Sequence, residues 1–156
     1  MARGAYEYAL DLLAARAYTV RNLRRKLVQK EFAADEVERT IVRLTESGLL
    51  DDRKYAAEYA RQKIVVAGSS VRRVRQELAK KGIDAESVGE SIDALLEEEP
   101  VDQEAAIERM AVKKLRSMGD LDGVVKRRRV FGFLARKGYE IDDINRVLAR
   151  ISLLLQ

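Results

Sequence analysis

The sequence predicts an all-α fold made of three tandem three-helix repeats. Apolar residues recur with helical spacing along almost the whole chain, and no segment shows the alternation that is typical of strands. The 156 residues include one proline and nine glycines, so few residues would interrupt helices. A set of apolar positions also recurs twice downstream at similar intervals, which indicates internal repeats.

The first fifty residues contain three predicted helices. Their apolar faces are formed by Leu10, Leu13 and Ala14, by Val20, Leu23 and Leu27, and by Val37, Ile41 and Leu44. Very short turns at residues 16–19 and 32–35 join the helices. Gly48 is predicted to end the third helix, because glycine readily adopts the left-handed conformation that follows many helices.

The second and third helices of this unit recur downstream. The positions of the first copy are Leu23, Leu27, Lys30, Val37, Ile41 and Leu44. A shift of 51 residues places them on Val74, Leu78, Lys81, Val88, Ile92 and Leu95. A further shift of 56 places them on Val130, Leu134, Lys137, Ile144, Leu148 and Ile151. Apolar residues fall on apolar residues and lysine on lysine, so the sequence predicts three copies of one unit.

Helix caps support the same division. Thr19 and Ser70 precede the second helix of the first and second copies, and hydroxyl residues are favoured N-caps. Asp51 and Asp52 are predicted to cap the helix that opens the second copy. Each copy therefore has its own helix-start signals.

Pro100 marks the boundary between the second and third copies, because proline disfavours helical geometry at the preceding residue. We therefore predict three domains, at residues 1–50, 51–99 and 100–156. One copy alone buries too small a share of its surface for high stability. Stacked copies would share their apolar faces, so we expect an elongated array that can curve.

The turn between the second and third helices differs among the copies. The second copy has Gly82-Ile83 and the third has Gly138-Tyr139, whereas the first has Glu31-Phe32. A non-glycine residue in the left-handed region costs about 1 kcal/mol. We therefore expect a different turn in the first copy.

The composition excludes several classes of function. The chain has no histidine and no cysteine, which removes disulfides, imidazole-dependent nucleophiles and most zinc sites. The phosphate-binding pattern G-x-x-x-x-G-K-[ST] is also absent. We expect neither an enzyme nor a cofactor.

Hydropathy and charge limit the kinds of partner that we expect. The first residues lack a positively charged segment followed by an uninterrupted apolar stretch, so we expect no signal peptide. No apolar stretch approaches the roughly 20 residues of a membrane span. We expect a cytoplasmic monomer without membrane contact. The net charge of +4 and the isoelectric point of about 9.4 allow an anionic partner.

Positive charge is concentrated on the predicted second helix of each copy, at residues 20–31, 71–81 and 126–137. These helices hold 16 of the 30 lysines and arginines but two of the 26 acidic residues. Spacings of three and four place the cations of each copy on a face away from the buried positions. The candidate residues for binding a partner or DNA are Arg21, Arg24, Arg25, Lys26, Arg72, Arg73, Arg75, Lys126, Arg127, Arg128 and Arg129.

Two interpretations of these basic stripes stand side by side. They are solvated faces that balance acidic residues on neighbouring helices, which is the usual role of surface charge. Alternatively, they bind a phosphate backbone or an acidic protein groove, since arginine matches both phosphate and carboxylate. Recurrence in all three copies, with acidic residues nearly absent, favours binding.

Short motifs in a fixed order also extend along the chain. They are Ala9-Leu10 with Leu13 and Arg16, Leu23 to Leu27, Gly48-Leu49-Leu50-Asp51-Asp52, Tyr55-Ala56 with Tyr59, Glu77-Leu78, Lys81-Gly82-Ile83, Phe133-Leu134 and Arg136-Lys137-Gly138-Tyr139. With these motifs in this order, the chain resembles the RecX regulatory proteins over essentially its whole length.

The resemblance implies three tandem three-helix repeats, which agrees with the periodicity. It also implies a partner, because proteins of this family bind the RecA recombinase filament on single-stranded DNA. They inhibit its ATPase, strand-exchange and coprotease activities, and so modulate recombination, DNA repair and the SOS response. Contacts with single-stranded DNA are implied, with double-stranded DNA as a further candidate. No catalytic residue is implied.

Two other classes of function stay open on the sequence alone. Short helices with a basic second member also describe independent helix-turn-helix DNA-binding proteins, which bind duplex DNA without a recombinase. A generic helical scaffold would instead recognise some other acidic protein.

Overall fold

The computed structural model describes residues 2–156, and over that part of the chain it contains helices and no strands. The helices are α1 (Ala5–Ala15), α2 (Val20–Gln29), α3 (Ala34–Glu46), α4 (Asp52–Ala60), the π-helix η1 (Arg61–Val66), α5 (Val71–Lys80), α6 (Ala85–Glu98), α7 (Gln103–Arg116), α8 (Gly123–Arg136), α9 (Ile141–Arg150) and the 3₁₀-helix η2 (Ser152–Leu155). The all-α prediction is confirmed.

The chain divides into two compact units. The first holds the described residues up to Tyr59 together with Glu77–Asp93, and the second holds Ala60–Gln76 with Ala94–Gln156. The division runs through α5 and α6, so the middle copy contributes residues to both units.

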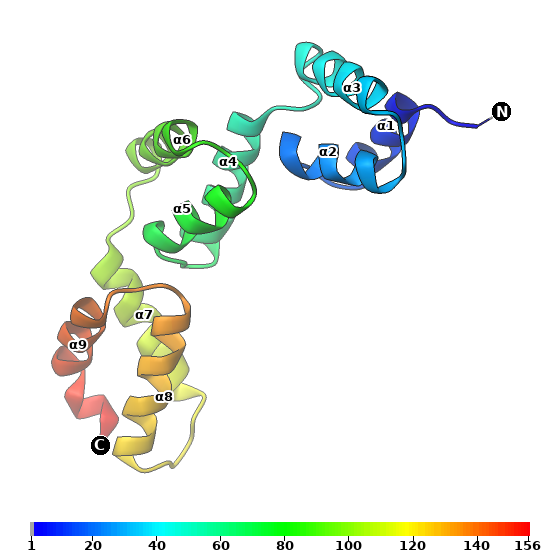
Figure 1. The fold of residues 1–156 in the computed structure, drawn as a ribbon. Helices are drawn as coiled ribbons and strands as arrows, with labels where there is room; N and C mark the ends of the chain where they lie inside the picture. Colours follow the sequence, from blue (N-terminus) through cyan, green and yellow to red (C-terminus); the bar gives the residue numbers. More distant parts are fainter. Residues whose placement is uncertain (1) are drawn as a thin grey trace. The chain divides into compact units, whose positions relative to one another are not determined.

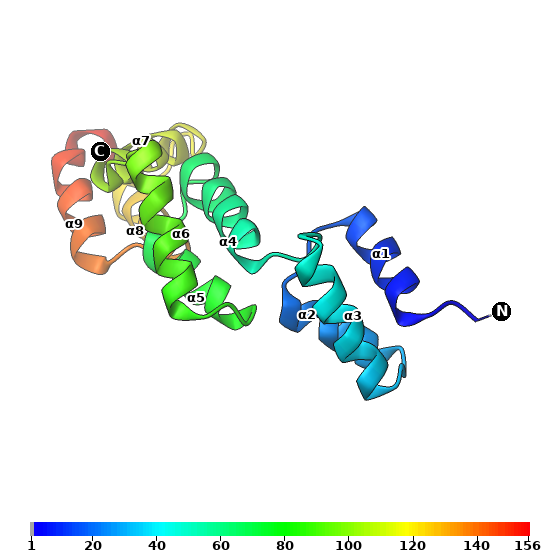
Figure 2. The same ribbon diagram turned by 90° about the horizontal axis from the view of Figure 1, so that it is seen from above.

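A three-helix bundle of α1, α2 and α3 lies in the first unit, as Figures 1 and 2 show. Its core consists of small residues of α1 and larger aliphatic residues of the other two helices: Ala5, Ala9, Leu23, Leu27, Val37, Ile41 and Leu44. The alanines of α1 let the other helices approach closely, while Tyr8 packs beside Phe32 at a centroid distance of 5.8 Å.

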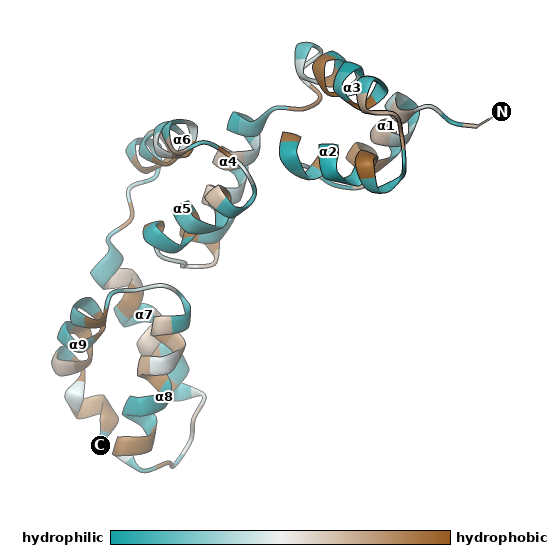
Figure 3. Ribbon diagram, in the orientation of Figure 1, coloured by the Kyte–Doolittle hydropathy of each residue, from teal (hydrophilic) through white to brown (hydrophobic). Residues whose placement is uncertain are grey.

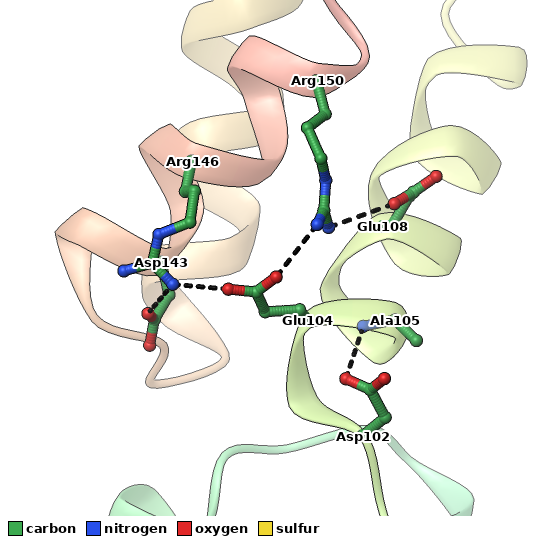
Figure 4. A network of polar contacts seen from close by, with 7 residues as sticks. All are labelled: Asp102, Glu104, Ala105, Glu108, Asp143, Arg146 and Arg150. Carbon is green, nitrogen blue, oxygen red and sulfur yellow. Dashed lines mark hydrogen bonds and ion pairs between the residues drawn. The ribbon is translucent and has the colours of Figure 1, made fainter.

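An equivalent bundle of α7, α8 and α9 lies in the second unit, and η2 packs against it (Figure 1). Salt bridges connect α7 to α9 on the outside of this bundle (Figure 4). Glu104 of α7 accepts hydrogen bonds from Arg146 and, at 2.9 Å, from Arg150. Arg150 also pairs with Glu108 at 3.2 Å.

The internal repeat is confirmed by burial. Every apolar position that the shifts of 51 and 56 residues align is buried in all three copies. Teal and brown residues alternate along α3 and α9 in Figure 3, as expected for helices with one buried face. The shift of 51 extends to the first helix, since Ala5 and Ala9 align with the buried Ala56 and Ala60.

The expectation of a different turn in the first copy is wrong. Glu31 has φ of 68°, compared with 90° for Gly82 and 92° for Gly138. Its amide bonds to Val28 O at 2.9 Å and the next amide bonds to Leu27 O at 3.4 Å, as in the other two copies. These bonds satisfy helix-end carbonyls and offset the cost of the left-handed conformation. The Glu31 side chain is exposed and has room to adopt it.

Helix starts follow the predicted caps at Thr19 and Ser70. Thr19 Oγ1 accepts a hydrogen bond from Asn22 N at 3.2 Å, and Ser70 Oγ accepts one from Arg73 N at 3.1 Å. The basic helix of the third copy starts earlier than the predicted residue 126, because Asp122 caps it.

Candidate functional site

The N-terminus of each of the first two basic helices contacts the next copy through a hydroxyl. We call the first set of contacts the first joint. Thr19 Oγ1, besides capping α2, donates to Lys81 O at 2.9 Å. The amide of Val20 donates to Asp52 Oδ1 at 2.9 Å. Arg21 packs on Gly82 so closely that a Cβ there would lie 2.7 Å from Arg21 Cβ.

Asp51 and Asp52 divide the capping that the sequence predicted for them as a pair. Asp51 Oδ1 accepts from the amides of Arg53 and Lys54 at 3.0 and 3.2 Å, so Asp51 caps α4. Asp52 instead serves the first joint. Burial raises the pKa of Asp52 above its ordinary value, against the lowering effect of the Val20 hydrogen bond, and Asp51 and Asp84 add to the rise.

The second joint, within the second unit, resembles the first, but its hydroxyl bonds to a carbonyl one position later in the repeat, because Lys137 and not Gly138 aligns with Lys81. Ser70 Oγ donates to Gly138 O at 2.8 Å, and Ser70 N donates to Lys137 O at 3.1 Å. A Cβ on Gly138 would lie 2.6 Å from Ser70 Oγ. Tyr139 adds a hydrogen bond to Gly68 O at 2.6 Å, and burial raises the pKa of its phenol.

The second joint also holds two of the predicted partner-binding cations. Arg72 forms an ion pair with Glu140 at 3.0 Å and donates to Gly138 O at 3.3 Å. Arg73 donates to the carbonyl oxygen of Arg136. Both side chains are exposed, but their guanidinium groups contribute to the contact between copies. The third cation of this stripe, Arg75, is exposed on the same helix.

The cations of α2 are partly engaged within the first unit. Arg24 forms a bidentate pair with Glu38 on α3, at 2.7 and 3.2 Å, and this pair lowers the pKa of the Glu38 carboxyl. Arg25 donates to Asn22 Oδ1 at 3.5 Å. Lys26 is exposed, and Arg21 covers Gly82 as described above.

The third basic stripe differs from the other two. We call it the α8 stripe, and it consists of Lys126, Arg127, Arg128 and Arg129. The three arginines are exposed and the lysine is half-buried. Among residues 2–156, none supplies a hydrogen bond or an ion pair to these four side chains. Four adjacent cations thus keep their full capacity for an external anion.

The joints involve residues for which the sequence predicted only local roles, in helix caps and turns. Thr19 and Ser70 were predicted as caps, while Gly82 and Gly138 were matched as turn residues. The only sequence feature that pointed to a joint was that Thr19 aligns with Ser70, and Gly82 with Gly138, in the internal repeat. It did not show that the cap of one copy contacts the turn of the next.

The described part of the chain supports neither a metal site nor a membrane span. Among residues 2–156, no three carboxylates lie close enough together to hold a metal ion. None of the helices there combines the length and hydropathy that a bilayer span needs.

The protein is a tandem helical-repeat protein. It has three equivalent three-helix copies, each with a basic second helix, and a hydroxyl-to-carbonyl contact joins each copy to the next. Family models for the first, second and third three-helix domains of RecX match residues 5–44, 51–91 and 102–148. The chain belongs to the RecX family of regulatory proteins.

Named relatives agree along nearly the full chain. The regulatory protein RecX of Trichlorobacter lovleyi is 36% identical over 148 residues, which cover 93% of this chain and 94% of that protein. The regulatory protein RecX of a Mycobacterium species (strain JLS) is 38% identical over 138 residues, covering 86% and 74%.

Solved structures share the fold. The crystal structure of RecX from Lactobacillus salivarius superposes with a TM-score of 0.72 at 21% identity, covering 96% of this chain and 95% of that one. A second crystal structure of a regulatory protein RecX gives a TM-score of 0.73 at 24% identity, with 92% and 70% covered.

Proposed function

We propose that this protein binds the RecA recombinase filament on single-stranded DNA and inhibits its ATPase, strand-exchange and coprotease activities. It would thereby modulate recombination, DNA repair and the SOS response as a cytoplasmic binding protein without catalytic activity of its own. Membership of the RecX family supports this proposal, since the matching relatives carry the name of regulatory proteins. The three domains would be residues 1–50, 51–99 and 100–156.

The α8 stripe is the single observation that carries the binding step. An arginine that already has a carboxylate partner must lose it before it can bind another anion. Arg24 and Arg72 have such partners, whereas Arg127 and Arg128 have none among residues 2–156. We therefore place the main contact, with acidic protein surface or exposed phosphate, on α8. The cations of α2 and α5 would add weaker contacts.

Inhibition would follow from contacts with adjacent recombinase subunits. Bridging two subunits would hold them in a state unfit for ATP turnover. Binding at the growing end would instead stop filament extension. The two routes differ in stoichiometry, because end binding needs far fewer copies than coverage of the whole filament.

The test is the single-stranded-DNA-dependent ATPase of the cognate RecA, titrated with the full chain at moderate salt. Inhibition at substoichiometric concentrations of the protein supports action at filament ends. Inhibition only near saturation supports coverage of the whole filament. Absence of inhibition would overturn the proposed function. Sequence-dependent duplex binding without recombinase would then favour the helix-turn-helix alternative.

A triple variant tests the assigned surface. Arg127→Ala, Arg128→Ala and Arg129→Ala together should raise the protein concentration for half-inhibition by about tenfold or more. The control is Arg39→Ala, Lys54→Ala and Arg116→Ala, which removes three exposed cations outside the basic helices and gives the same net charge as the first triple variant. Equal inhibition by both triple variants would contradict the assignment to α8.

A further inference from the structure

Each joint borders a cavity, and the two cavities are equivalent by the internal repeat. The cavity of the first unit is about 620 Å³ and that of the second is about 760 Å³. A shift of 51 residues carries lining residues of the first onto lining residues of the second. The pairs include Leu13 with Ile64, Leu49 with Pro100 and Glu58 with Arg109.

The two cavities carry opposite kinds of charge. The first is lined by two carboxylates, Asp51 and Glu58, and one lysine, Lys54. The second is lined by Arg109, Lys113, Lys114 and Lys137, with Asp102 as its one carboxylate. Asp102 Oδ1 already accepts the amide of Ala105 at 3.1 Å, because it caps α7. Equivalent positions in one fold thus produce a cationic cavity only at the second joint.

The four cations of the second cavity lack a carboxylate partner within the described part of the chain. No acidic residue between positions 2 and 156 forms an ion pair with any of them. Lys137 Nζ donates to Ala67 O at 3.2 Å, which leaves its remaining donors available. Four positive groups around one hollow repel one another, and an anion would relieve this repulsion.

An apolar wall lies beside these charges. Phe133 lines the cavity, and the amines of Lys114 and Lys137 lie 5.2 and 5.8 Å from its ring centroid. Met110 lines the same cavity, and Ala106 stands where the first cavity has Tyr55. The smaller side chain fits the larger volume of the second cavity.

We propose that the cavity of the second joint binds a nucleoside polyphosphate. The phosphates would contact Arg109, Lys113 and Lys114, while the base would pack against Phe133. A cavity of about 760 Å³ lies within the ordinary range of small-molecule sites. Charge alone would suit any polyanion, but the aromatic wall favours a phosphate that carries a base. The proposal needs no recombinase and does not depend on the proposed function.

Isothermal titration calorimetry on the full chain tests it with ATP as the probe. Inorganic triphosphate, adenosine and a short single-stranded DNA are titrated in parallel. We expect saturable binding of ATP, with triphosphate about tenfold weaker because it lacks the base. No saturable binding of ATP would overturn the proposal. Equal binding of ATP and triphosphate, or binding of DNA alone, would do so as well.

A variant with the residues of the preceding copy locates the site. Arg109→Glu and Lys113→Gln introduce the residues that occupy the equivalent positions as Glu58 and Gln62. Both side chains are exposed, so folding should persist, as an unchanged circular dichroism spectrum would show. The double variant should bind ATP at least about tenfold more weakly. Its melting temperature should not rise with ATP, whereas that of the wild type should.

A charge-matched control uses the α8 stripe. Arg127→Ala, Arg128→Ala and Arg129→Ala together remove three positive charges, the same change in net charge as the double variant. ATP binding by this control should stay within about twofold of the wild type. An equal loss in both variants would show nonspecific attraction of a polyanion and overturn the site.

Discussion

Ser70 donates its hydroxyl hydrogen to the carbonyl oxygen of Gly138, 68 residues further along the chain, at 2.8 Å. Ser70 Oγ also accepts a hydrogen bond from Arg73 N at 3.1 Å, so one hydroxyl caps a helix and ties it to the next copy. Thr19 does the same at the first joint, with Asn22 N and Lys81 O. The joint is therefore a repeated part of the fold, which links one copy to the next by satisfying polar groups of both.

Removal of this hydroxyl should destabilise the protein. Ser70→Ala loses the cap and leaves Gly138 O without the hydroxyl, and we expect a loss of about 1–3 kcal/mol in the free energy of unfolding. Urea denaturation followed by circular dichroism measures it. Ser70→Thr supplies the residue that the first copy uses and should retain most of the stability. A wild-type midpoint for Ser70→Ala would contradict the double role of the hydroxyl.

Glycine at the joint turns is required for two separate reasons. Gly82, Gly138 and Gly48 all have positive φ, and alanine at each should cost about 1 kcal/mol. A Cβ on Gly138 would also lie 2.5 Å from Arg73 Cβ, while a Cβ on Gly48 would meet nothing within 4 Å. Thermal or urea denaturation should therefore show a larger loss for Gly138→Ala than for Gly48→Ala. Equal losses would mean that the joint adapts without cost.

Glu31 offers the converse test. It adopts the same left-handed turn without a glycine, with φ of 68°. Glu31→Gly should raise the free energy of unfolding by up to about 1 kcal/mol, reduced by the larger entropy of glycine in the unfolded chain. Glu31→Ala keeps the conformational cost and removes the charge, so it is the control. A destabilised Glu31→Gly variant would show that the glutamate side chain stabilises the turn.

The sequence predicted the helices and the buried positions, because these depend on spacings within a few residues. It predicted the repeat because the same residue types recur after shifts of 51 and 56 residues. The wrong expectation at Glu31 came from treating one backbone preference as decisive, although hydrogen bonds at the helix end offset it. The partners of Arg72 could not be predicted, since Gly138 and Glu140 lie on another copy. The repeat predicted three basic stripes at equivalent positions, but the partners of their side chains differ from copy to copy.

Arg72 therefore makes a poor test of partner binding by itself. Alanine at this position would remove contacts to Gly138 O and Glu140 as well as a cation from the surface. The α8 stripe avoids this ambiguity, because its cations support no described contact between copies.

The hydrogen bonds of Glu104 should make the protein less stable at low pH. Hydrogen bonds from Arg146, and then from Arg150, lower the pKa of this carboxyl below its ordinary 4.5 (Figure 4). A lowered pKa in the folded state gives stability that is present above pH 4.5 and is lost as the pH falls through the folded-state pKa. Glu104→Gln should therefore lower the urea midpoint at neutral pH and bring it closer to the wild type in acid. A constant difference would contradict the shift.

Asp52 should show the opposite dependence. Burial raises its pKa in the folded state above the ordinary 3.8, so the folded chain binds this proton more tightly than the unfolded chain. The wild type thus loses stability at this residue as the pH rises from 3.8 through the folded-state pKa. Asp52→Asn keeps an oxygen that can accept from Val20 N but carries no charge. Urea midpoints across this pH range should show the asparagine variant gaining on the wild type as the pH rises to neutral, and a variant that loses ground instead would show that the carboxylate charge stabilises the first joint.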